Sequence, residues 1–204
     1  MHNNEIKMEQ ILELSRQNLI KANLIINKLQ IKEIWESLGG TCNLVGSVKN
    51  RLLLNNLDID FHTYTDDFSI TKSFQAIARI CEHPGIKDAI YKNLLEAEDR
   101  CLEWHLTFQD DDNRIWTIDI IHIKNDSRYA GMIERVTEKI NQKLTDKIRE
   151  DILRIKWESS QSNDKIIGIE IYQAVIEGGA QNYEDFKEWK KHQPDTYISL
   201  WEPT

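Results

Sequence analysis

The chain has 204 residues, a length that fits one domain of ordinary size or one catalytic domain with a short appendix. Hydrophobic residues make up 40% and charged residues 29%, values that exclude a disordered or fibrous chain. With 26 Lys and Arg against 34 Asp and Glu, the formal charge is −8. This charge argues against nucleic acid as a partner, because binding to a phosphate backbone requires clustered cations.

The cysteines and the apolar runs indicate the compartment. The 3 cysteines, Cys42, Cys81 and Cys101, are odd in number and widely spaced, which is typical of reduced thiols and not of a disulfide or zinc framework. The first ten residues are polar, unlike a signal peptide, and no apolar run approaches the roughly 18 residues that span a membrane. We therefore expect a cytoplasmic protein with no membrane association.

The first part of the chain alternates between helical and extended patterns. Apolar residues recur at helical spacing over 5–38, with a break into two helices near Lys21, and Gly39-Gly40 ends this region. Residues 41–45 then form a short predicted strand that ends at Gly46-Ser47.

The middle of the chain contains the clearest strand patterns. Residues 57–63 alternate strictly, and helices are expected over 71–81 and 86–98. The segments 101–109 and 114–123 alternate again on either side of a polar turn, so they predict a β-hairpin.

From Tyr129 onward the spacing is helical, and helices are expected over 129–155, 165–176 and 183–192. The sequence therefore predicts an α+β fold, in which a mixed β-sheet flanked by helices precedes a helical C-terminal segment. We place the catalytic domain at 1–126 and the helical segment at 127–204.

Three aspartates in predicted strands carry the chemical signal. Asp58 and Asp60 are two residues apart in a strand, so their carboxylates share one face, and the resulting repulsion is relieved by a divalent cation such as Mg²⁺. Asp119 is a single acid among apolar strand residues, where burial is costly unless it is paired or bound to metal. Each feature alone is also consistent with acids that face solvent.

The order of these features resembles a known signature. Gly46-Ser47 ends a strand, ten residues follow, Asp58-Ile59-Asp60 comes next, and Asp119 lies in a later strand. This order resembles that of the DNA polymerase β-like nucleotidyltransferase superfamily, over roughly residues 38–123.

The resemblance implies a role for each motif residue. Gly46 and Ser47 are similar to the turn that holds the β- and γ-phosphates of an NTP. Asp58 and Asp60 are similar to ligands that bridge two Mg²⁺ ions, and Asp119 to the ligand of the catalytic metal. Two cations about 4 Å apart stabilise the attacking oxygen and the leaving pyrophosphate, which agrees with the implied chemistry.

Two positions depart from the family pattern. Arg51 stands where many members have glycine, and Leu57 where many have a small polar residue. Lys49 and Arg51 are candidates for contacts with triphosphate oxygens, because Arg suits phosphate, while surface cations in a loop are the alternative.

Three further side chains have two interpretations each, and a fourth, His122, has one. His62 shares the face of Asp58 and is either a partner of the metal ligands or an ordinary strand histidine, whereas His122 alternates away from Asp119. By analogy with small antibiotic-modifying relatives, Tyr172 lines an acceptor site or packs in a core. Trp201 packs back onto the chain or meets a partner.

The resemblance predicts a Mg²⁺-dependent enzyme that transfers a nucleoside monophosphate from an NTP to an acceptor hydroxyl or phosphate. The size and the acidic charge favour a small-molecule acceptor. Two alternatives remain: a protein-modifying adenylyltransferase of toxin–antitoxin type, and an inactive nucleotide-binding or interaction module, which the departures at Arg51 and Leu57 favour. The sequence does not indicate the oligomeric state.

Overall fold

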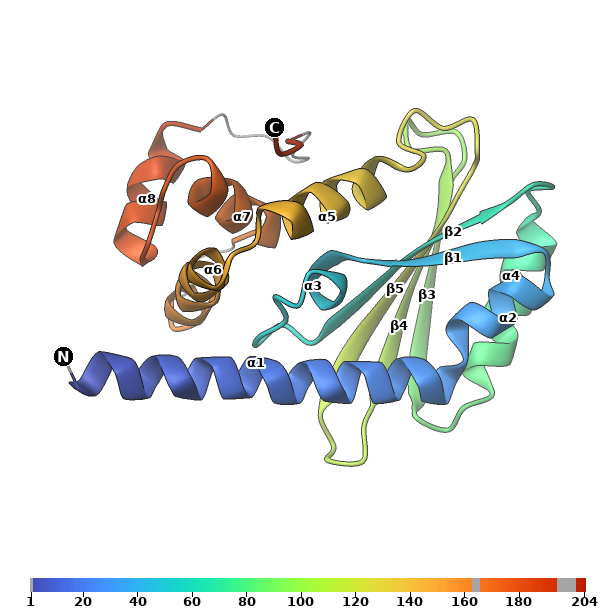
Figure 1. Cartoon of the computed structure of the whole chain (residues 1–204). Coiled ribbons are helices and arrows are strands. Elements are labelled where there is room, and N and C mark those ends of the chain that lie inside the picture. The colour runs from blue at the N-terminus through green and yellow to red at the C-terminus, as the bar shows by residue number, and fades with distance from the viewer. Residues whose placement is uncertain (1, 163–165, 194–200) are drawn as a thin grey trace. The chain divides into compact units, whose positions relative to one another are not determined.

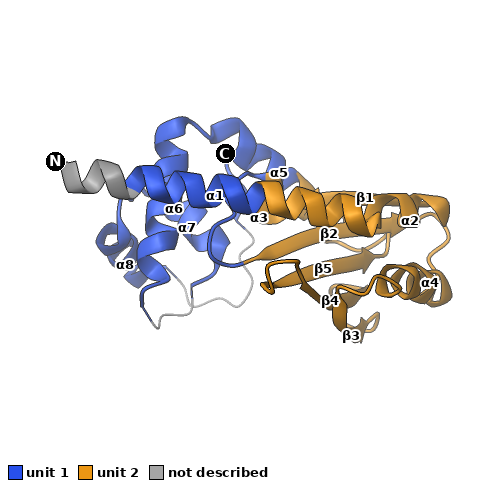
Figure 2. Ribbon diagram, turned by 90° about the horizontal axis from the view of Figure 1, so that it is seen from below, with its two compact units in different colours: residues 1–19, 50–56, 135–204 blue, residues 20–49, 57–134 orange. Residues whose placement is uncertain are grey.

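The computed structural model of the chain describes residues 2–162, 166–193 and 201–204. The elements are labelled in Figure 1, and Figure 2 colours the two compact units into which the chain divides. Unit 1 comprises residues 1–19, 50–56 and 135–204, and unit 2 comprises residues 20–49 and 57–134. Helix α1 (His2–Leu29) contributes its first part to unit 1 and its second part to unit 2. The domain boundary expected after residue 126 stays a prediction.

Unit 2 is built around a five-stranded mixed sheet, with strand order β1-β2-β5-β4-β3. Strands β2 and β5 are parallel neighbours, and the other neighbouring pairs are antiparallel. The bounds are β1 Gly40–Val45, β2 Asp58–Thr65, β3 Ile86–Leu94, β4 Cys101–Gln109 and β5 Ile115–Ile123. The expected mixed sheet flanked by helices is confirmed, and the expected hairpin is β4–β5.

The two faces of the sheet differ because strand residues alternate. One face is buried under helices α2 (Ile31–Ser37) and α4 (Ile70–Cys81), whose inward residues include the fully buried Trp35 and Ile80. His122 lies on this buried face, stacked on Phe68, so it points away from Asp119 as expected. The opposite face is the one that carries Asp58, Asp60 and Asp119, and below it is called the polar face.

Two expected elements differ from the structure. Residues 86–98 were expected to be a helix, but residues 86–94 form strand β3. Ile86, Ile90 and Leu94 recur every four residues, which fits a helix and also fits alternate positions of a strand. Since β3 is an edge strand with most side chains exposed, its alternation is weak, and pairing with β4 decides its conformation.

The expected break in the N-terminal helix also lies elsewhere. Helix α1 continues through Lys21 and ends at Leu29, and Gln30 separates it from α2 with a left-handed backbone, φ 49°. Neither glycine nor proline marks this position, so the sequence contains no local signal for the break.

Unit 1 is helical. The stripe expected over 129–155 forms two helices, α5 (Met132–Lys143) and α6 (Asp146–Ser159), because Thr145 caps the start of α6 through its hydroxyl. Helices α7 (Gly168–Ile176) and α8 (Tyr183–Lys191) pack with them around one apolar cluster. Residue 165, the first of the expected 165–176 helix, lies outside the described residues, as do 163, 164 and 194–200.

The open interpretations of Tyr172 and Trp201 are resolved by this packing. Tyr172 is buried within the apolar cluster of unit 1, and Trp201 packs against the same cluster. Both aromatic side chains therefore serve the core of unit 1. Among the described residues, no helix has the length and apolarity needed to cross a bilayer.

Candidate active site

The three aspartates of the motif lie on the polar face of the sheet. Asp60 lies directly opposite Asp119 in the parallel pair β2–β5, and Asp58 lies opposite Thr117. Strand alternation turns all three carboxylates to the same face, and each residue is half-buried. The structure thus places Asp119 beside Asp60, although 58 residues, Phe61 to Ile118, separate them in the sequence.

This arrangement suits a divalent cation. Like charges on directly opposite strand positions repel, and partial burial strengthens the repulsion between Asp60 and Asp119. Carboxylate oxygens are the hard ligands that Mg²⁺ prefers, and two or three of them from a rigid sheet form a suitable donor set. The donor chemistry of the site therefore fits the metal that the motif implies.

Gly46 lies against the carboxylate of Asp60. A Cβ atom added to Gly46 would lie 2.3 Å from Asp60 Oδ2, and the backbone of Gly46 has a φ of +67°. Only glycine allows this approach without strain, because its left-handed backbone and the missing side chain are both needed. The first half of the motif is thus in contact with the second half.

The residues after Gly46 lie in different surroundings. Ser47 is half-buried in the short helix α3 (Gly46–Lys49), and Lys49 is exposed at its end. Arg51 belongs to unit 1, where its carbonyl oxygen accepts a hydrogen bond of 2.8 Å from Arg149 Nη1. The structure brings Gly46, Ser47 and Lys49 into one unit with the aspartates, and it assigns Arg51 to the other.

The segment that links the two halves of the motif is anchored within unit 1. Leu52, Leu53 and Leu54 are fully buried. The carbonyl oxygens of Leu53 and Leu54 accept hydrogen bonds of 2.7 Å from Ser15 Oγ and Asn18 Nδ2 of helix α1. The ten-residue spacing between Gly46-Ser47 and Asp58 therefore contains a buried apolar run, Leu52 to Leu54, that hydrogen bonds hold in place.

His105 is a site residue that the sequence patterns alone did not identify. It lies opposite Asp119 in the antiparallel pair β4–β5, and its Nδ1 atom is 2.8 Å from Asp119 Oδ1. Its other ring nitrogen, Nε2, is 3.1 Å from Glu103 Oε2. A histidine that donates to one carboxylate oxygen of Asp119 fixes the rotation of that carboxylate and leaves the second oxygen for another ligand.

A signal for His105 was present in the sequence. The polar turn of the hairpin is centred near Asp112, and His105 and Asp119 each lie seven residues from that centre. A hairpin with this register places the two residues opposite each other, on the same face. The turn expected over 110–113 would pair His105 with Ile118, one residue from Asp119, and the longer turn of the structure, 110–114, sets the observed register.

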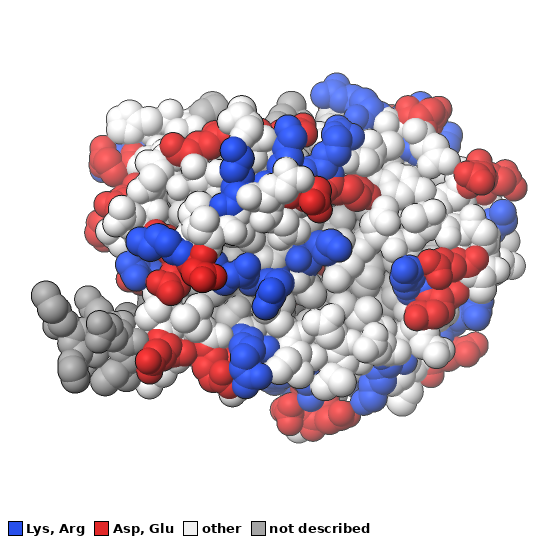
Figure 3. Space-filling view, viewed as in Figure 1, with Lys and Arg blue, Asp and Glu red and all other residues white. Residues whose placement is uncertain are grey.

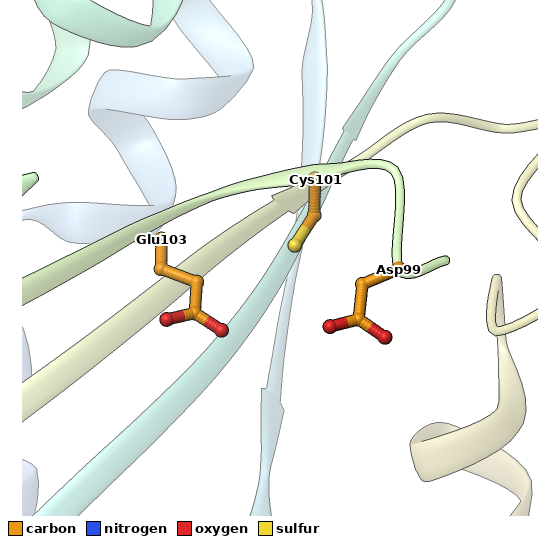
Figure 4. Close-up of side chains that lie close together, drawn as sticks. All are labelled: Asp99, Cys101 and Glu103. Carbon is orange, nitrogen blue, oxygen red and sulfur yellow. The ribbon is translucent and has the colours of Figure 1, made fainter. Parts of the chain in front are cut away.

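Glu103 also borders a second group of potential metal ligands. Asp99, Cys101 and Glu103 have ligand atoms within 4.8 Å of one another, and Figure 4 shows the three side chains directed to one side of the chain at the start of β4. Burial raises the pKa of the Cys101 thiol to about 12, so the thiol is protonated at neutral pH in the metal-free protein. Glu103 is already paired with Lys92 at 3.1 Å, so we assign this group no metal role.

His62 has a partner from helix α5. Its Nδ1 atom is 3.4 Å from Glu134 Oε2, and Tyr64 donates a hydrogen bond of 2.8 Å to Glu134 Oε1. Burial raises the pKa of Glu134, but the contacts with His62 and Tyr64 outweigh burial and lower the pKa to about 2. His62 thus faces a carboxylate that is ionised at neutral pH, one position along the strand face from Asp60.

The fold of the chain matches those of several solved structures. An RNA terminal U-transferase described as cytoplasmic matches with a TM-score of 0.57 and 17% identity, over 82% of this chain and 50% of that protein. Cid1, described as having RNA terminal uridylyl transferase activity, matches with a TM-score of 0.62 and 16% identity, over 82% of this chain and 53% of Cid1. The chain has the nucleotidyltransferase fold. The resemblance drawn from the motif is therefore confirmed at the level of the fold.

The region that matches these solved structures covers most of this chain but only about half of each neighbour. A further Cid1 structure, in complex with a UTP analogue, matches with a TM-score of 0.58 and 13% identity, over 86% of this chain and 55% of Cid1. The chain thus spans about half the length of these enzymes. No protein-family model and no curated protein matches the sequence.

Proposed function

We propose that the protein is a metal-dependent nucleotidyltransferase, which transfers a nucleoside monophosphate from an NTP to an acceptor and releases pyrophosphate. The observation that carries the proposal is the pairing of Asp60 with Asp119 on one sheet face, with Gly46 in contact with Asp60. The likeness to solved uridylyltransferases, one of them bound to a UTP analogue, supports the same chemistry.

In this proposal each residue has a defined task. Asp58 and Asp60 would hold Mg²⁺ ions that also bind the triphosphate, and Asp119 would complete the site beside the acceptor hydroxyl. Bound Mg²⁺ would supply charge neutralisation for the attacking and leaving oxygens of an in-line displacement. Gly46 allows the backbone to approach the phosphates, and the Ser47 hydroxyl is a donor at the same turn. His105 is a positioning residue that keeps one oxygen of Asp119 engaged.

The identity of the acceptor is a more specific part of the proposal. The net charge of −8 favours a small molecule, and basic and acidic side chains are interspersed in the view of Figure 3. Two of the neighbours are described as acting on RNA termini, so the expectation that nucleic acid is excluded receives no support from the comparisons. We retain a small-molecule hydroxyl as the proposed acceptor, with an RNA 3′ hydroxyl as the second candidate.

The reaction type is tested by incubating the protein with each of the four NTPs, labelled with ³²P at the α-phosphate, together with Mg²⁺. A pool of small metabolites and a short single-stranded RNA serve as separate acceptors. We expect labelled product with at least one acceptor, loss of product with Asp58→Asn or Asp60→Asn, and full activity with Asp67→Asn, which changes an exposed loop acid.

The two acceptors give different products. Label that migrates with a small molecule supports the proposed acceptor, whereas RNA extended at its 3′ end supports the second candidate. Absence of product with both acceptors, together with no Mg²⁺-dependent binding of any NTP by calorimetry, would overturn the assignment as an enzyme.

A further inference from the structure

The outer edge of strand β3 presents a regular set of backbone groups. Asp110 N donates to the Arg114 carbonyl oxygen, so the even-numbered residues of β4 bond to β5. The odd-numbered residues of β4 therefore face β3, as the bond from Gln109 N to the Gly85 carbonyl oxygen shows. Across the β3–β4 register these residues oppose Asp88, Ile90 and Lys92.

It follows that the intervening residues of β3 point their N–H and C=O groups outward. These residues are Ala89, Tyr91 and Asn93. No strand in the described part of the chain pairs with this edge. Figure 2 shows β3 at the margin of the sheet of unit 2. An exposed strand edge of this kind is a template for pairing with another strand.

The side chains of β3 are self-complementary in one antiparallel register. If Ile90 is placed opposite Ile90 of a second copy, Asp88 falls opposite Lys92 on both sides of the two-fold axis. Ile86 then falls opposite Leu94, outside the charged pairs. Opposite charges on facing strand positions stabilise a sheet, and like charges destabilise it.

The same register satisfies the outward backbone groups. Ala89 of one copy pairs with Tyr91 of the other on each side of the axis. The Ala89 N–H, which donates to Asp88 Oδ1 of its own chain at 2.8 Å, transfers its hydrogen bond to the second strand and releases the Asp88 carboxylate for Lys92. Ile90 occupies a non-hydrogen-bonded position, where facing side chains approach most closely. A register shifted by two residues would place Ile90 against Lys92 and would lose both charge pairs.

Exposed apolar side chains flank the edge on both faces of the sheet. Ile90 is 51% exposed on the polar face, although it is a large apolar residue. On the other face, Phe74 and Ile70 of helix α4 are 46% and 41% exposed, one turn apart on the same side of the helix. The Phe74 ring lies 4.9 Å from the Tyr91 ring, so this apolar surface reaches β3 itself.

Two features that commonly protect an edge strand have other roles here. Lysines and bulges deter pairing at free edges. Lys87 donates to the Pro84 carbonyl oxygen and lies at the irregularity between Ile86 and Asp88, so the stretch from Asp88 to Lys92 remains regular. Lys92 contacts Glu103 of its own chain, and its ammonium group retains donors for a second carboxylate.

We propose that the protein forms a two-fold symmetric dimer through antiparallel pairing of β3 with β3 of a second copy, centred on Ile90. The two sheets become one continuous sheet, with Asp88–Lys92 pairs on either side of the axis. The pairing segment is short, so the dimer is a weak one, with a dissociation constant on the order of 1–100 μM. The proposal is independent of the enzymatic activity.

Charge exchange tests the register. Asp88→Lys and Lys92→Asp each create two like-charged pairs, so each variant alone should dimerise about tenfold more weakly in sedimentation velocity. An equimolar mixture of the two variants should regain dimerisation, since the mixed dimer has only opposite charges. Asp111→Lys, which changes an exposed acid in the hairpin turn, should leave the dissociation constant of the dimer at its wild-type value.

Cross-linking tests the axis. Ile90→Cys in a Cys81→Ser background should form a disulfide-linked dimer under mild oxidation, because Cα atoms of a non-hydrogen-bonded pair lie about 4.5 Å apart. Ile115→Cys is the matched control, as Ile115 is a strand isoleucine of similar exposure, 54%. A wild-type chain that stays monomeric at several hundred micromolar, or a dimer that neither the charge exchange nor Ile90→Cys affects, would overturn the proposal.

Discussion

His105 Nδ1 lies 2.8 Å from Asp119 Oδ1, across the antiparallel pair that places these two residues directly opposite each other. The contact joins the last acid of the proposed metal site to a side chain that is itself held by Glu103. A carboxylate that accepts a fixed hydrogen bond at one oxygen presents the other oxygen in one orientation. The geometry of the site thus depends on a histidine that the motif does not contain.

We predict that His105→Ala lowers kcat about 10- to 100-fold and leaves KM for the NTP nearly unchanged, because the acid remains but its orientation is lost. His105→Asn, whose amide can donate from a similar position, should recover part of the loss. Steady-state kinetics and Mg²⁺ titrations of activity measure both effects. His192→Asn, at an exposed histidine of unit 1, is the control.

A purely structural role for His105 would give a different result. In that case the thermal midpoint would fall with both variants, and kcat would follow stability and not the presence of a donor. Equal turnover of His105→Ala and wild type would exclude a positioning role.

Gly46→Ala is predicted to abolish activity. Its Cβ would meet Asp60 Oδ2 at 2.3 Å, and the φ of +67° adds backbone strain of about 1 kcal/mol or more. Gly39→Ala separates the two effects, because Gly39 has a φ of +78° and nothing within 4 Å of an added Cβ. In urea unfolding, backbone strain should lower the free energy of unfolding of both variants by similar amounts. Only Gly46→Ala should lose NTP turnover.

These two residues show what the sequence could reveal. The spacing of the motif linked Gly46 to Asp60 only through the family resemblance, and the structure brings them together because the strand before Gly46 runs antiparallel to the strand that carries Asp60. Asp58 and Asp60 share a face by alternation alone. The partnership of Asp60 with Asp119 required the parallel pair β2–β5, which is a non-local contact that no periodicity encodes.

The parts that sequence patterns missed have physical reasons. Strand β3 is exposed on most of its length, so burial did not impose a clear alternation, and its four-residue spacing suited either structure. Residues 50–56 were not assigned to any element, although their buried leucines anchor them in unit 1. Glu134, which faces His62, lies on a helix remote in sequence and carried no motif.

Asp110 is predicted to be the most sensitive residue of the β4–β5 hairpin. Its carboxylate is buried and accepts hydrogen bonds from the backbone N–H groups of Asp112 and Arg114 and from Trp116 Nε1. Asp110→Ala leaves these donors without an acceptor, so we expect a loss of about 2–4 kcal/mol in the free energy of unfolding. Chemical denaturation of the variant and the wild type measures this loss.

Asp111→Ala is the matched control for Asp110, because Asp111 is exposed and pairs with exposed Lys28. Its effect should stay within about 0.5 kcal/mol. Comparable losses for the two variants would show that the turn is held by its backbone and not by the Asp110 carboxylate.

His122 predicts how stability depends on pH. Burial lowers the pKa of His122 from 6.5 to about 4, because its ring lies between Trp35 and Phe68 and has no room for hydration. Between these two pKa values the unfolded chain binds a proton that the folded chain excludes. The folded state therefore becomes less stable as the pH falls. The stabilisation is complete above pH 6.5 and is lost towards pH 4, by up to about 3 kcal/mol.

Urea unfolding between pH 5 and pH 7 isolates this effect from that of Glu134. The pKa of Glu134 is lowered from 4.5 to about 2, so its contribution is complete above pH 4.5 and is lost only towards pH 2. His122→Phe, which keeps an aromatic ring beside Phe68 but does not titrate, should flatten the slope between pH 5 and pH 7. An unchanged slope in this variant would show that another group binds the proton on unfolding.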